Sequence, residues 1–281
     1  MGELAYIKGV ITNINDAYVH IEDRGYQFGE GVYEVIKVYN GKPFALRPHI
    51  QRLNKSAIGM AISFPWDIDF LEKEILKLLN RAELKYANIY MQVTPGAAPR
   101  SHLLEKAPEP NLVITIRRSA EPREIKGIKV ITVDDIRWKK CWIKSTNLTA
   151  NIMAKKTARK EGAGEAIMCE TDGTVNEGGS SNLFAVIDGV LVTPKLYNKI
   201  LAGITRDIVL QIAEYRNLQY KEDKLLIDDL RSAQEVLVTS TTFEITYVSH
   251  INNLIIGDGN PGTVTRAIYT YYKELVKQQC F

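Results

Sequence analysis

Residues 32–39 alternate strictly between two faces, and they constrain the fold of this 281-residue chain more than any other segment. In an extended strand, successive side chains point to opposite sides. One face would then carry Val32, Glu34, Ile36 and Val38. Asn40-Gly41 follows directly and supplies the two positive-φ positions of a type I′ hairpin turn. The chain is therefore expected to contain an antiparallel sheet near its amino terminus.

Further periodic segments mix helices and strands without regular alternation. Helical patterns cover a segment that begins near Pro48 and residues 69–84, 148–161, 205–216 and 263–276. Strand patterns cover residues 87–94, 112–117, 128–133, 165–169, 182–187 and 235–238, and Asp188-Gly189 predicts a second tight hairpin. No Gly-x-Gly-x-x-Gly motif follows a strand. The predicted class is α+β with two domains, and a doubly wound nucleotide-binding fold is disfavoured.

The most linker-like segment is the polar stretch at residues 119–124, which contains Pro122. It divides the chain into a predicted small domain at residues 1–118 and a larger domain at residues 125–281.

Composition excludes several classes of function. The net charge is +3 with both signs interleaved, so the basic stripe that nucleic-acid binding needs is missing. No apolar run approaches the roughly 20 residues of a membrane span, and the first residues do not resemble a signal peptide, so a cytoplasmic protein is expected. The three cysteines and four histidines lack metal-ligand spacing, and no metal site is predicted.

Two stretches of the first domain carry candidate binding residues. Residues 22–34 are glycine-rich and lead into a strand that begins near Tyr33. Taken alone, this stretch is better explained as a turn with a packed tyrosine. Residues 94–102 form a loop with two prolines in which Arg100 and His102 lie two positions apart. In extended backbone both side chains point to the same side and could bind one carboxylate. Taken alone, this fragment is better explained as a solvated surface loop.

A third stretch places Lys144 after Trp138, Trp142 and Ile143 and before Ser145-Thr146-Asn147, residues suited to cap the next helix. A lysine in apolar surroundings loses hydration, which disfavours the ammonium form and leaves the amine available as a nucleophile or base.

The second domain offers a candidate anion site. Glu177 precedes two glycines and two serines, Gly203-Ile204-Thr205-Arg206 opens a helix, and Thr239-Ser240-Thr241-Thr242 ends a strand. Amide groups at a helix start together with hydroxyls can cradle a phosphate, and Arg52 could add a bidentate charge.

Taken together and in this order, these stretches resemble the class IV (fold-type IV) aminotransferases, and most closely their bacterial D-amino acid branch. The resemblance runs from about residue 21 to the end of the chain. It rests on Glu22-Asp23-Arg24-Gly25-Tyr26-Gln27-Phe28-Gly29, Ala98-Pro99-Arg100-Ser101-His102, Asp135-Ile136-Arg137-Trp138, Ile143-Lys144-Ser145, Glu177-Gly178, Gly203-Ile204-Thr205-Arg206-Asp207 and Val238-Thr239-Ser240-Thr241-Thr242. It implies a two-domain enzyme with a small α/β amino-terminal domain, a larger β-rich carboxyl-terminal domain and pyridoxal phosphate between them.

The resemblance also implies roles for individual residues. Lys144 matches the lysine that carries the cofactor and moves a proton at the substrate Cα, and Glu177 matches the carboxylate that pairs with the pyridine nitrogen. The phosphate cup would contain Arg52, Ile204, Thr205 and Thr241, with Arg137 and Ser240 near the cofactor. The substrate carboxylate would be held by Tyr33 together with Arg100 and His102 of a second subunit, which implies a homodimer.

The implied reaction is ping-pong transfer of the amino group from a D-amino acid such as D-alanine to a 2-oxo acid such as 2-oxoglutarate. Branched-chain L-amino acid aminotransferases typically carry a tyrosine where this chain has Thr149, and they often read Glu-Gly-x-Gly-x-Asn where it has Glu177-Gly178-Gly179-Ser180-Ser181-Asn182. They remain the main alternative, followed by an aminodeoxychorismate lyase and by a protein that only holds the cofactor. Pro95 and Gly179 depart from the family pattern, which leaves the side-chain range of the substrate open.

Overall fold

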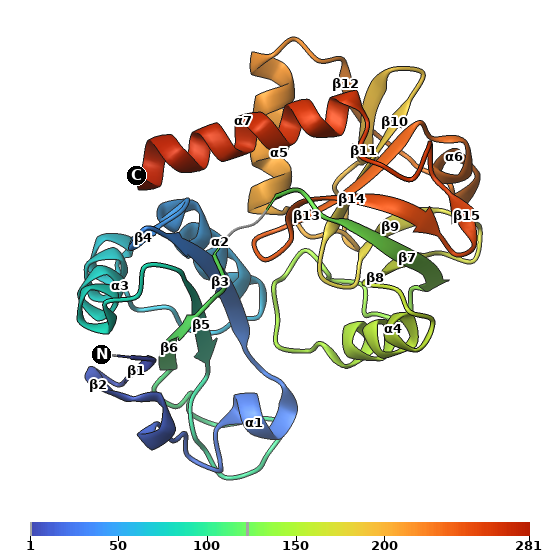
Figure 1. The fold of residues 1–281 in the computed structure, drawn as a ribbon. Coiled ribbons are helices and arrows are strands. Elements are labelled where there is room, and N and C mark those ends of the chain that lie inside the picture. Colours follow the sequence, from blue (N-terminus) through green and yellow to red (C-terminus); the bar gives the residue numbers. More distant parts are fainter. Residues whose placement is uncertain (1, 122–123) are drawn as a thin grey trace. The chain divides into compact units, whose positions relative to one another are not determined.

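The computed structural model describes residues 2–121 and 124–281, and its helices and sheets confirm the α+β class (Figure 1). Pro122 and Arg123, which belong to the predicted linker at residues 119–124, lie outside the described residues.

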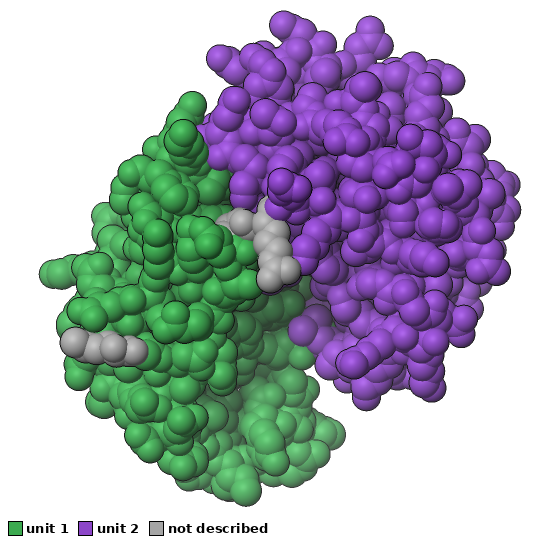
Figure 2. All heavy atoms as spheres, in the orientation of Figure 1, with its two compact units in different colours: residues 1–122, 143–147, 276–281 green, residues 123–142, 148–275 purple. Residues whose placement is uncertain are grey.

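The chain forms two compact units (Figure 2). The first contains Met1–Pro122, Ile143–Asn147 and Val276–Phe281, and the second contains Arg123–Trp142 and Leu148–Leu275. The predicted domain at residues 125–281 is therefore too inclusive, because the segment around Lys144 and the last six residues belong to the first unit. Neither exception has a signal in local sequence, since both follow from contacts with distant residues.

The first unit is built on a six-stranded antiparallel sheet in the order β2-β1-β6-β5-β3-β4. The strands are β1 (Leu4–Ile7), β2 (Val10–Asn13), β3 (Val32–Tyr39), β4 (Lys42–Pro43), β5 (Ala87–Thr94) and β6 (Asn111–Arg118). Asn40 and Gly41 have φ values of 49° and 76°, which confirms the hairpin turn predicted after β3. Alternate residues of β3 are buried from Val32 onward, as its pattern predicts.

The helical elements of the first unit are η1 (Ile14–Asp16), α1 (Arg24–Phe28), α2 (Leu46–Gly59) and α3 (Ile68–Ala82). Of these, α2 and α3 supply most of the buried helical residues. Helix α2 packs on β3 and on α3, and α3 also contacts β1 and β6. The apolar stripe of α3 buries Leu71, Ile75 and Leu78 completely, and each such side chain contributes about 1.5–3 kcal/mol. Helix α3 ends at Ala82, and its C-cap residue Glu83 adopts a left-handed conformation.

The second unit contains a nine-stranded mixed sheet in the order β12-β11-β10-β13-β14-β7-β8-β9, with β15 paired to β14. The strands are β7 (Gly127–Asp134), β8 (Glu165–Cys169), β9 (Val175–Gly178), β10 (Asn182–Ile187), β11 (Val190–Pro194), β12 (Tyr220–Asp223), β13 (Glu235–Ser240), β14 (Glu244–Ile251) and β15 (Leu254–Ile255). Strands β7 and β8 are parallel, as are β11 and β12, because a helix connects each pair.

The helices of this unit are α4 (Thr149–Lys160), α5 (Ile204–Tyr215), α6 (Ile227–Ser232) and α7 (Thr263–Cys280). Helix α4 packs on β7 and β8, α5 on β12 and β13, and α6 on β10. A buried apolar cluster joins residues of the sheet, among them Val130, Leu183 and Val238, to Leu230 of α6. Helix α7 runs from the second unit into the carboxyl-terminal residues of the first (Figure 1).

Several elements were not predicted from sequence, among them the β1–β2 hairpin, α1 and the short strands β9 and β12. Strand β12 is exposed at all four positions and therefore lacks an apolar alternation. Within the described ranges, no helix is both long enough and apolar enough to cross a bilayer.

Candidate active site

Lys144 is fixed between β3 and α2 in the first unit. Its carbonyl accepts a hydrogen bond from the Tyr33 amide at 2.9 Å, and its own amide donates to the Ser56 hydroxyl at 3.2 Å. Ser145 forms an isolated bridge with Val32. The ammonium nitrogen lies 4.4 Å from the centroid of the Tyr33 ring. The structure thus brings Lys144 and Tyr33 together, and both are partly exposed.

The expectation that Ser145-Thr146-Asn147 cap the following helix is wrong. Helix α4 begins at Thr149 after Leu148, and no described side chain caps it. Instead, the Thr146 hydroxyl donates to the carbonyls of Gly29 and Gly31 at 2.8 and 3.2 Å. These contacts attach the lysine segment to the glycine-rich stretch that precedes β3. Any Cβ at Gly31 would lie 3.1 Å from that hydroxyl, so the close approach favours glycine.

Arg52 of α2 takes part in a buried ion cluster on the inner face of β3. Its Nε and Nη2 atoms bind the two oxygens of Glu34 at 2.6 and 2.9 Å, and the His49 Nδ1 atom lies 2.7 Å from Glu34 Oε2. Burial alone would raise the pKa of Glu34, but the charge of Arg52 and the hydrogen bonds from His49 and Arg52 lower it to about 2. Burial lowers the pKa of His49, and the nearby charges of Arg52 and Lys144 act in the same direction. Glu34 therefore carries a full negative charge that orients Arg52.

Glu34→Gln is expected to destabilise the fold at pH 7 by about 3–5 kcal/mol, because it leaves a largely buried guanidinium without its countercharge. The folded pKa of about 2 lies below the unfolded value of about 4.3, so this contribution is complete above the unfolded pKa and is lost as the pH falls toward 2. Urea unfolding of the protein without ligands measures this effect. The difference in the free energy of unfolding between wild type and variant should be smaller at pH 3 than at pH 7. Glu72→Gln, which breaks an exposed pair with Arg47, should cost less than about 1 kcal/mol, and an equal loss in both variants would contradict the assignment.

Arg100 and His102 converge on the ring of Phe28 in α1. The Arg100 guanidinium carbon lies 4.5 Å from the ring centroid, and the His102 ring meets it edge-on at 5.7 Å. Both residues are exposed. Arg100 and His102 thus share a contact with one aromatic ring, that of Phe28.

Arg24 anchors this loop, a role that its sequence did not reveal. Its Nη1 and Nη2 atoms donate to the carbonyls of Ser101 and His102 at 2.6 and 3.3 Å, while its Nε atom pairs with Glu30 at 2.5 Å. Only the fold shows that Arg24 is buried. In the sequence, the signal for its role was the arginine's position within a glycine-rich stretch. Gly96 fixes the loop from its other end, because its φ of +100° and a carbonyl that would lie 2.0 Å from any Cβ admit only glycine.

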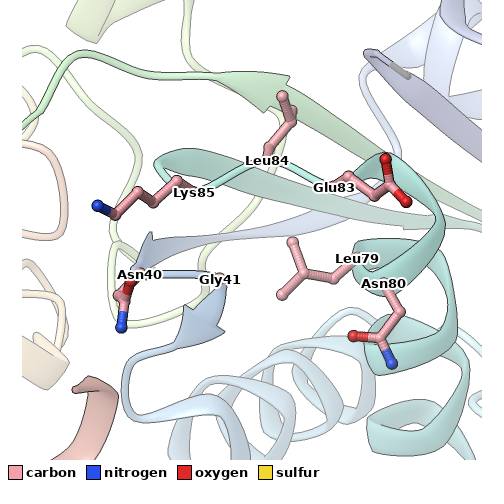
Figure 3. A pocket seen from close by; sticks show the side chains of 7 residues that line it. All are labelled: Asn40, Gly41, Leu79, Asn80, Glu83, Leu84 and Lys85. Carbon is pink, nitrogen blue, oxygen red and sulfur yellow. The ribbon is translucent and has the colours of Figure 1, made fainter.

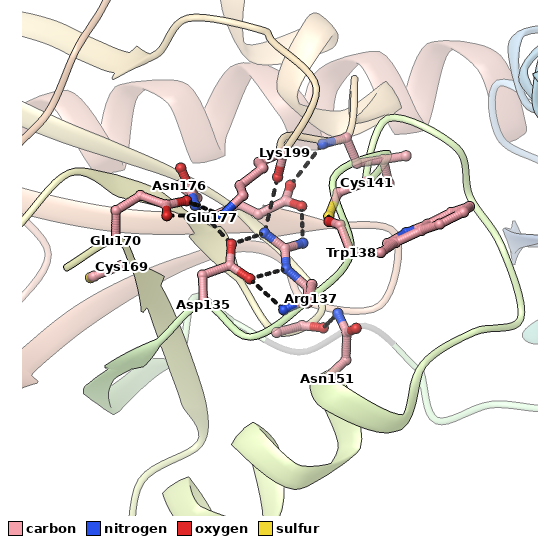
Figure 4. Close-up of polar contacts among 12 residues, drawn as sticks. Asp135, Arg137, Trp138, Cys141, Asn151, Cys169, Glu170, Asn176, Glu177 and Lys199 are labelled. Atoms are coloured by element: carbon pink, nitrogen blue, oxygen red, sulfur yellow. Dashed lines mark hydrogen bonds and ion pairs between the residues drawn. The ribbon is translucent and has the colours of Figure 1, made fainter. Parts of the chain in front are cut away.

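In the second unit, Glu177 of β9 is the centre of another group of predicted site residues (Figure 4). Its side chain is nearly buried, and Oε1 lies 2.5 Å from the Nη1 atom of Arg137. Oε2 accepts hydrogen bonds from the Asn182 amide group at 3.1 Å and from the Leu201 backbone amide at 3.0 Å. Three donors from separate segments thus stabilise the ionised carboxylate and hold it in one orientation.

Asn182 connects this carboxylate to the start of α5. Its Nδ2 atom also donates to the Leu201 carbonyl at 2.8 Å, and a Cβ at Gly203 would lie 1.9 Å from its Oδ1 atom. Asn182 pairs in register with Thr239 of β13, so the helix start, the end of β13 and Glu177 share one scaffold.

The start of α5 has the features of an anion site. Gly203 is the N-cap residue, and no side chain in the described part of the chain caps the helix. The first amide groups of a helix have no intrahelical acceptor, and the helix dipole favours an anion there. Ile204 and the buried Thr205 begin the first turn of α5. Ser240 is the last residue of β13, and Thr241 comes directly after it.

The predicted site residues therefore fall into two sets. The first unit holds Lys144, Tyr33, Arg52, Arg100 and His102, and the second unit holds Glu177, Arg137, Ile204, Thr205, Ser240 and Thr241. Among the residues described, no group of three or more His, Cys, Asp or Glu side chains could hold a metal ion.

A pocket of about 300 Å³ lies elsewhere, where the β3–β4 turn meets the end of α3 (Figure 3). It is lined by Asn40, Gly41, Leu79, Asn80, Glu83, Leu84 and Lys85. Its two charged residues are exposed, and no predicted site residue lines it, so we do not assign it to the active site.

Comparison with known proteins decides the family. The family model for amino-transferase class IV matches residues 31–251. The chain belongs to the class IV aminotransferases. Among similar proteins of this family, the D-alanine aminotransferase of Staphylococcus epidermidis is 38% identical over 275 residues and covers 97% of both chains. The D-alanine aminotransferase of Listeria innocua is 40% identical over 271 residues, which is 95% of this chain and 93% of the other.

Solved structures of class IV enzymes share the fold. A branched-chain aminotransferase from Thermoproteus uzoniensis superposes with a TM-score of 0.91 at 26% identity and covers 99% of this chain and 96% of its own. The branched-chain amino acid aminotransferase from Escherichia coli has a TM-score of 0.89 at 26% identity, with 98% of this chain and 94% of its own covered. The resemblance and the fold type predicted from sequence are thereby confirmed.

Class IV aminotransferases use pyridoxal phosphate, and solved branched-chain relatives contain pyridoxamine 5'-phosphate or N-(5'-phosphopyridoxyl)-L-glutamate. The residues of this chain fit that cofactor. The uncapped start of α5 suits a phosphate, and the ionised Glu177 suits a protonated ring nitrogen. The chain is therefore an aminotransferase that depends on pyridoxal phosphate.

Proposed function

We propose that this enzyme transfers the amino group of a D-amino acid, such as D-alanine, to a 2-oxo acid such as 2-oxoglutarate by a ping-pong mechanism. The supporting observation is the 38–40% identity to D-alanine aminotransferases over nearly the whole chain, compared with 26% to the branched-chain enzymes described above. Amino acids and 2-oxo acids are accordingly the small-molecule partners.

Bound pyridoxal phosphate supplies a conjugated ring that withdraws electrons from the substrate Cα. Lys144 carries the cofactor and transfers the proton at Cα, with its backbone fixed by Tyr33 and Ser56. Arg52, oriented by Glu34, binds the phosphate group.

The second unit contributes two groups of residues that are assigned to the cofactor. Glu177 pairs with the ring nitrogen, and Arg137 keeps that carboxylate in place. The phosphate-binding groups proposed here are the amides and hydroxyls of Ile204, Thr205, Ser240 and Thr241 at the start of α5 and the end of β13. Because Asn182 links Glu177 to Gly203, the distance between these two anchors is fixed before the cofactor binds.

The substrate carboxylate is assigned to Tyr33 together with Arg100 and His102. We place Arg100 and His102 in the active site of a second copy of the chain, so that the functional enzyme is a homodimer. The rigid attachment of their loop to α1 through Arg24 supports a preformed carboxylate site.

Arg100→Ala is expected to raise the KM for D-alanine roughly 10- to 100-fold with the cofactor still bound, because one charge-assisted hydrogen bond to the carboxylate is lost. Steady-state kinetics and the visible absorbance of the bound cofactor measure the two quantities. Arg117→Ala, which removes an exposed arginine of the same unit that pairs with Glu3, should leave KM unchanged. An unchanged KM in Arg100→Ala would exclude the carboxylate assignment.

A branched-chain L-amino acid aminotransferase is the second candidate, because the solved structures described above are of that kind and share the whole fold. Assays with D-alanine, L-leucine and aminodeoxychorismate as alternative substrates separate it and a lyase from the proposed function. D-alanine should give the highest kcat/KM. Higher kcat/KM with L-leucine would replace the proposal.

The two departures from the family pattern lie in sterically constrained segments. Pro95 precedes the strained Gly96 at the base of the Arg100 loop. Gly179 follows Glu177 closely, and a Cβ there would lie 3.0 Å from Glu165 Oε1 and 3.2 Å from Lys155 Cγ. These contacts leave little room for a larger residue at this position.

A further inference from the structure

A largely buried ring of polar groups includes the arginine that holds Glu177 (Figure 4). Asp135 follows β7, and its carboxylate is fully buried. Its Oδ1 atom accepts hydrogen bonds from the amide and the Nε atom of Arg137, both at 3.0 Å, and Oδ2 accepts from Nη2 of the same guanidinium at 2.8 Å. Arg137 is thereby held between two carboxylates, Asp135 on one side and Glu177 on the other.

The contacts continue around the ring through β9. The Asn176 Nδ2 atom donates to Asp135 Oδ2 and to Glu170 Oε1, both at 2.7 Å. Lys199 pairs with both oxygens of Glu170 at 2.6 and 2.8 Å, and the Lys199 carbonyl accepts from Arg137 Nη2 at 2.9 Å. The ring therefore closes on Arg137, and the position of each member depends on the others.

The charges of this network leave one negative charge in excess. Its carboxylates are Asp135, Glu170 and Glu177, and its cations are Arg137 and Lys199. If Arg137 faced Glu177 alone, the pair would be neutral and would attract a cation only weakly. Asp135 restores the negative charge, and a protonated ring nitrogen is the cation that balances it.

The ionisation states support this count. Burial would raise the pKa of Asp135, but the hydrogen bonds and charge of Arg137, together with the Asn176 amide, lower it. Burial would lower the pKa of Arg137, yet its bonds to Asp135 and the charge of Glu177 raise it.

The two thiols and the phenol that face the network are uncharged at neutral pH. Burial raises the pKa of Cys141 to about 11 and that of Cys169 to about 12. Burial and the charge of Glu170 raise the pKa of Tyr197, whose hydroxyl binds Asn176, to about 12. Asp134, next to Asp135, is exposed at the end of β7, and Asp172, which faces Tyr197, is exposed and pairs with Lys224.

We propose that Asp135 is a positioning residue which, through Arg137, sets how strongly Glu177 retains the proton on the ring nitrogen of the cofactor. The proposal rests on the proposed assignment of Glu177 to that nitrogen. Asp135 itself touches neither the cofactor nor the substrate in this scheme. Its effect reaches the reaction by fixing the guanidinium and by supplying the excess charge.

Asp135→Asn tests the proposal, since it preserves shape and removes one negative charge. The holoenzyme is reconstituted with pyridoxal phosphate labelled with ¹⁵N at the ring nitrogen, and its ¹⁵N chemical shift is followed against pH. The midpoint for loss of the ring proton should fall by about one pH unit, a roughly tenfold change in proton affinity. The kcat for transamination should fall as well, with the KM for the amino donor unchanged.

Asp172→Asn is the matched control, because it removes a charge from the exposed pair of Asp172 with Lys224 in the same unit. Its midpoint should equal that of the wild type. Glu170→Gln, at the partly exposed end of the network, should lower the midpoint by less than Asp135→Asn. If Asp135→Asn does not fold, Glu170→Gln tests whether the charge of the network sets the midpoint. A network variant that folds and titrates like Asp172→Asn, even with a lower Tm, would show that the network is only structural.

The titration does not depend on which amino acid is the donor. If D-alanine fails as a substrate while Asp135→Asn still shifts the midpoint, the donor assignment is wrong and the network proposal stands. If the midpoint is unchanged while D-alanine is a good donor, the network proposal is wrong and the donor assignment stands.

Discussion

Lys144→Ala is expected to lower transamination by about 10⁴-fold or more, because the variant loses both the amine that carries the cofactor and the group that transfers the proton. Steady-state assays with D-alanine and 2-oxoglutarate measure the loss. The visible absorbance of covalently held cofactor should disappear at the same time. The effect should exceed that of any other single substitution proposed here.

The fold of Lys144→Ala should survive, because the hydrogen bonds at this position are made by the backbone. The amide binds Ser56 and the carbonyl binds Tyr33, and neither needs the side chain. Thermal unfolding of the apoprotein checks this point. Lys140→Ala, which removes an exposed lysine four residues earlier, should retain full activity. A Lys144→Ala protein that still binds cofactor covalently would assign that role to another lysine.

Glu177→Gln is expected to lower kcat by about 10²- to 10³-fold, the range seen when one preorganised electrostatic group is removed from an active site. The glutamine keeps the size of the side chain but cannot balance a proton on the ring nitrogen. Arg137 remains bound to Asp135, so the local structure should persist. Cofactor affinity, measured by titrating the apoprotein, should change much less than kcat.

A carboxylate that pairs with an arginine elsewhere in the same unit provides the control for Glu177→Gln. Glu222 binds Arg206 at 2.6 Å, and Glu222→Gln should leave kcat near the wild-type value. Equal losses in both variants would point to a general effect on stability. A Glu177→Gln enzyme with wild-type kcat would remove Glu177 from the mechanism.

The regular elements were predictable because their signals are local. The alternation in β3, the Asn40-Gly41 turn and the apolar stripe of α3 each arise from neighbouring residues, and the structure contains all three. The family was also predictable, because its motifs are short and keep their order along the chain.

The supports of the site could not be predicted because they depend on contacts between distant residues. Arg24 binds the backbone of a loop 77 residues later, and Asn176 reaches Asp135 across 41 residues. Thr146 illustrates the same limit, since its local pattern indicated a helix cap while its hydroxyl binds Gly29, 117 residues away. Local sequence thus identified the groups proposed for the chemistry, whereas only the fold shows what orients them.

The stereochemistry of the first half-reaction tests the proposed function most directly. The holoenzyme is mixed rapidly with D-alanine or with L-alanine, without an acceptor, and the visible absorbance of the bound cofactor is recorded. We expect D-alanine to bleach the band within the time of a turnover and L-alanine to leave it unchanged. Bleaching by L-alanine alone would contradict the assignment of this enzyme to D-amino acids.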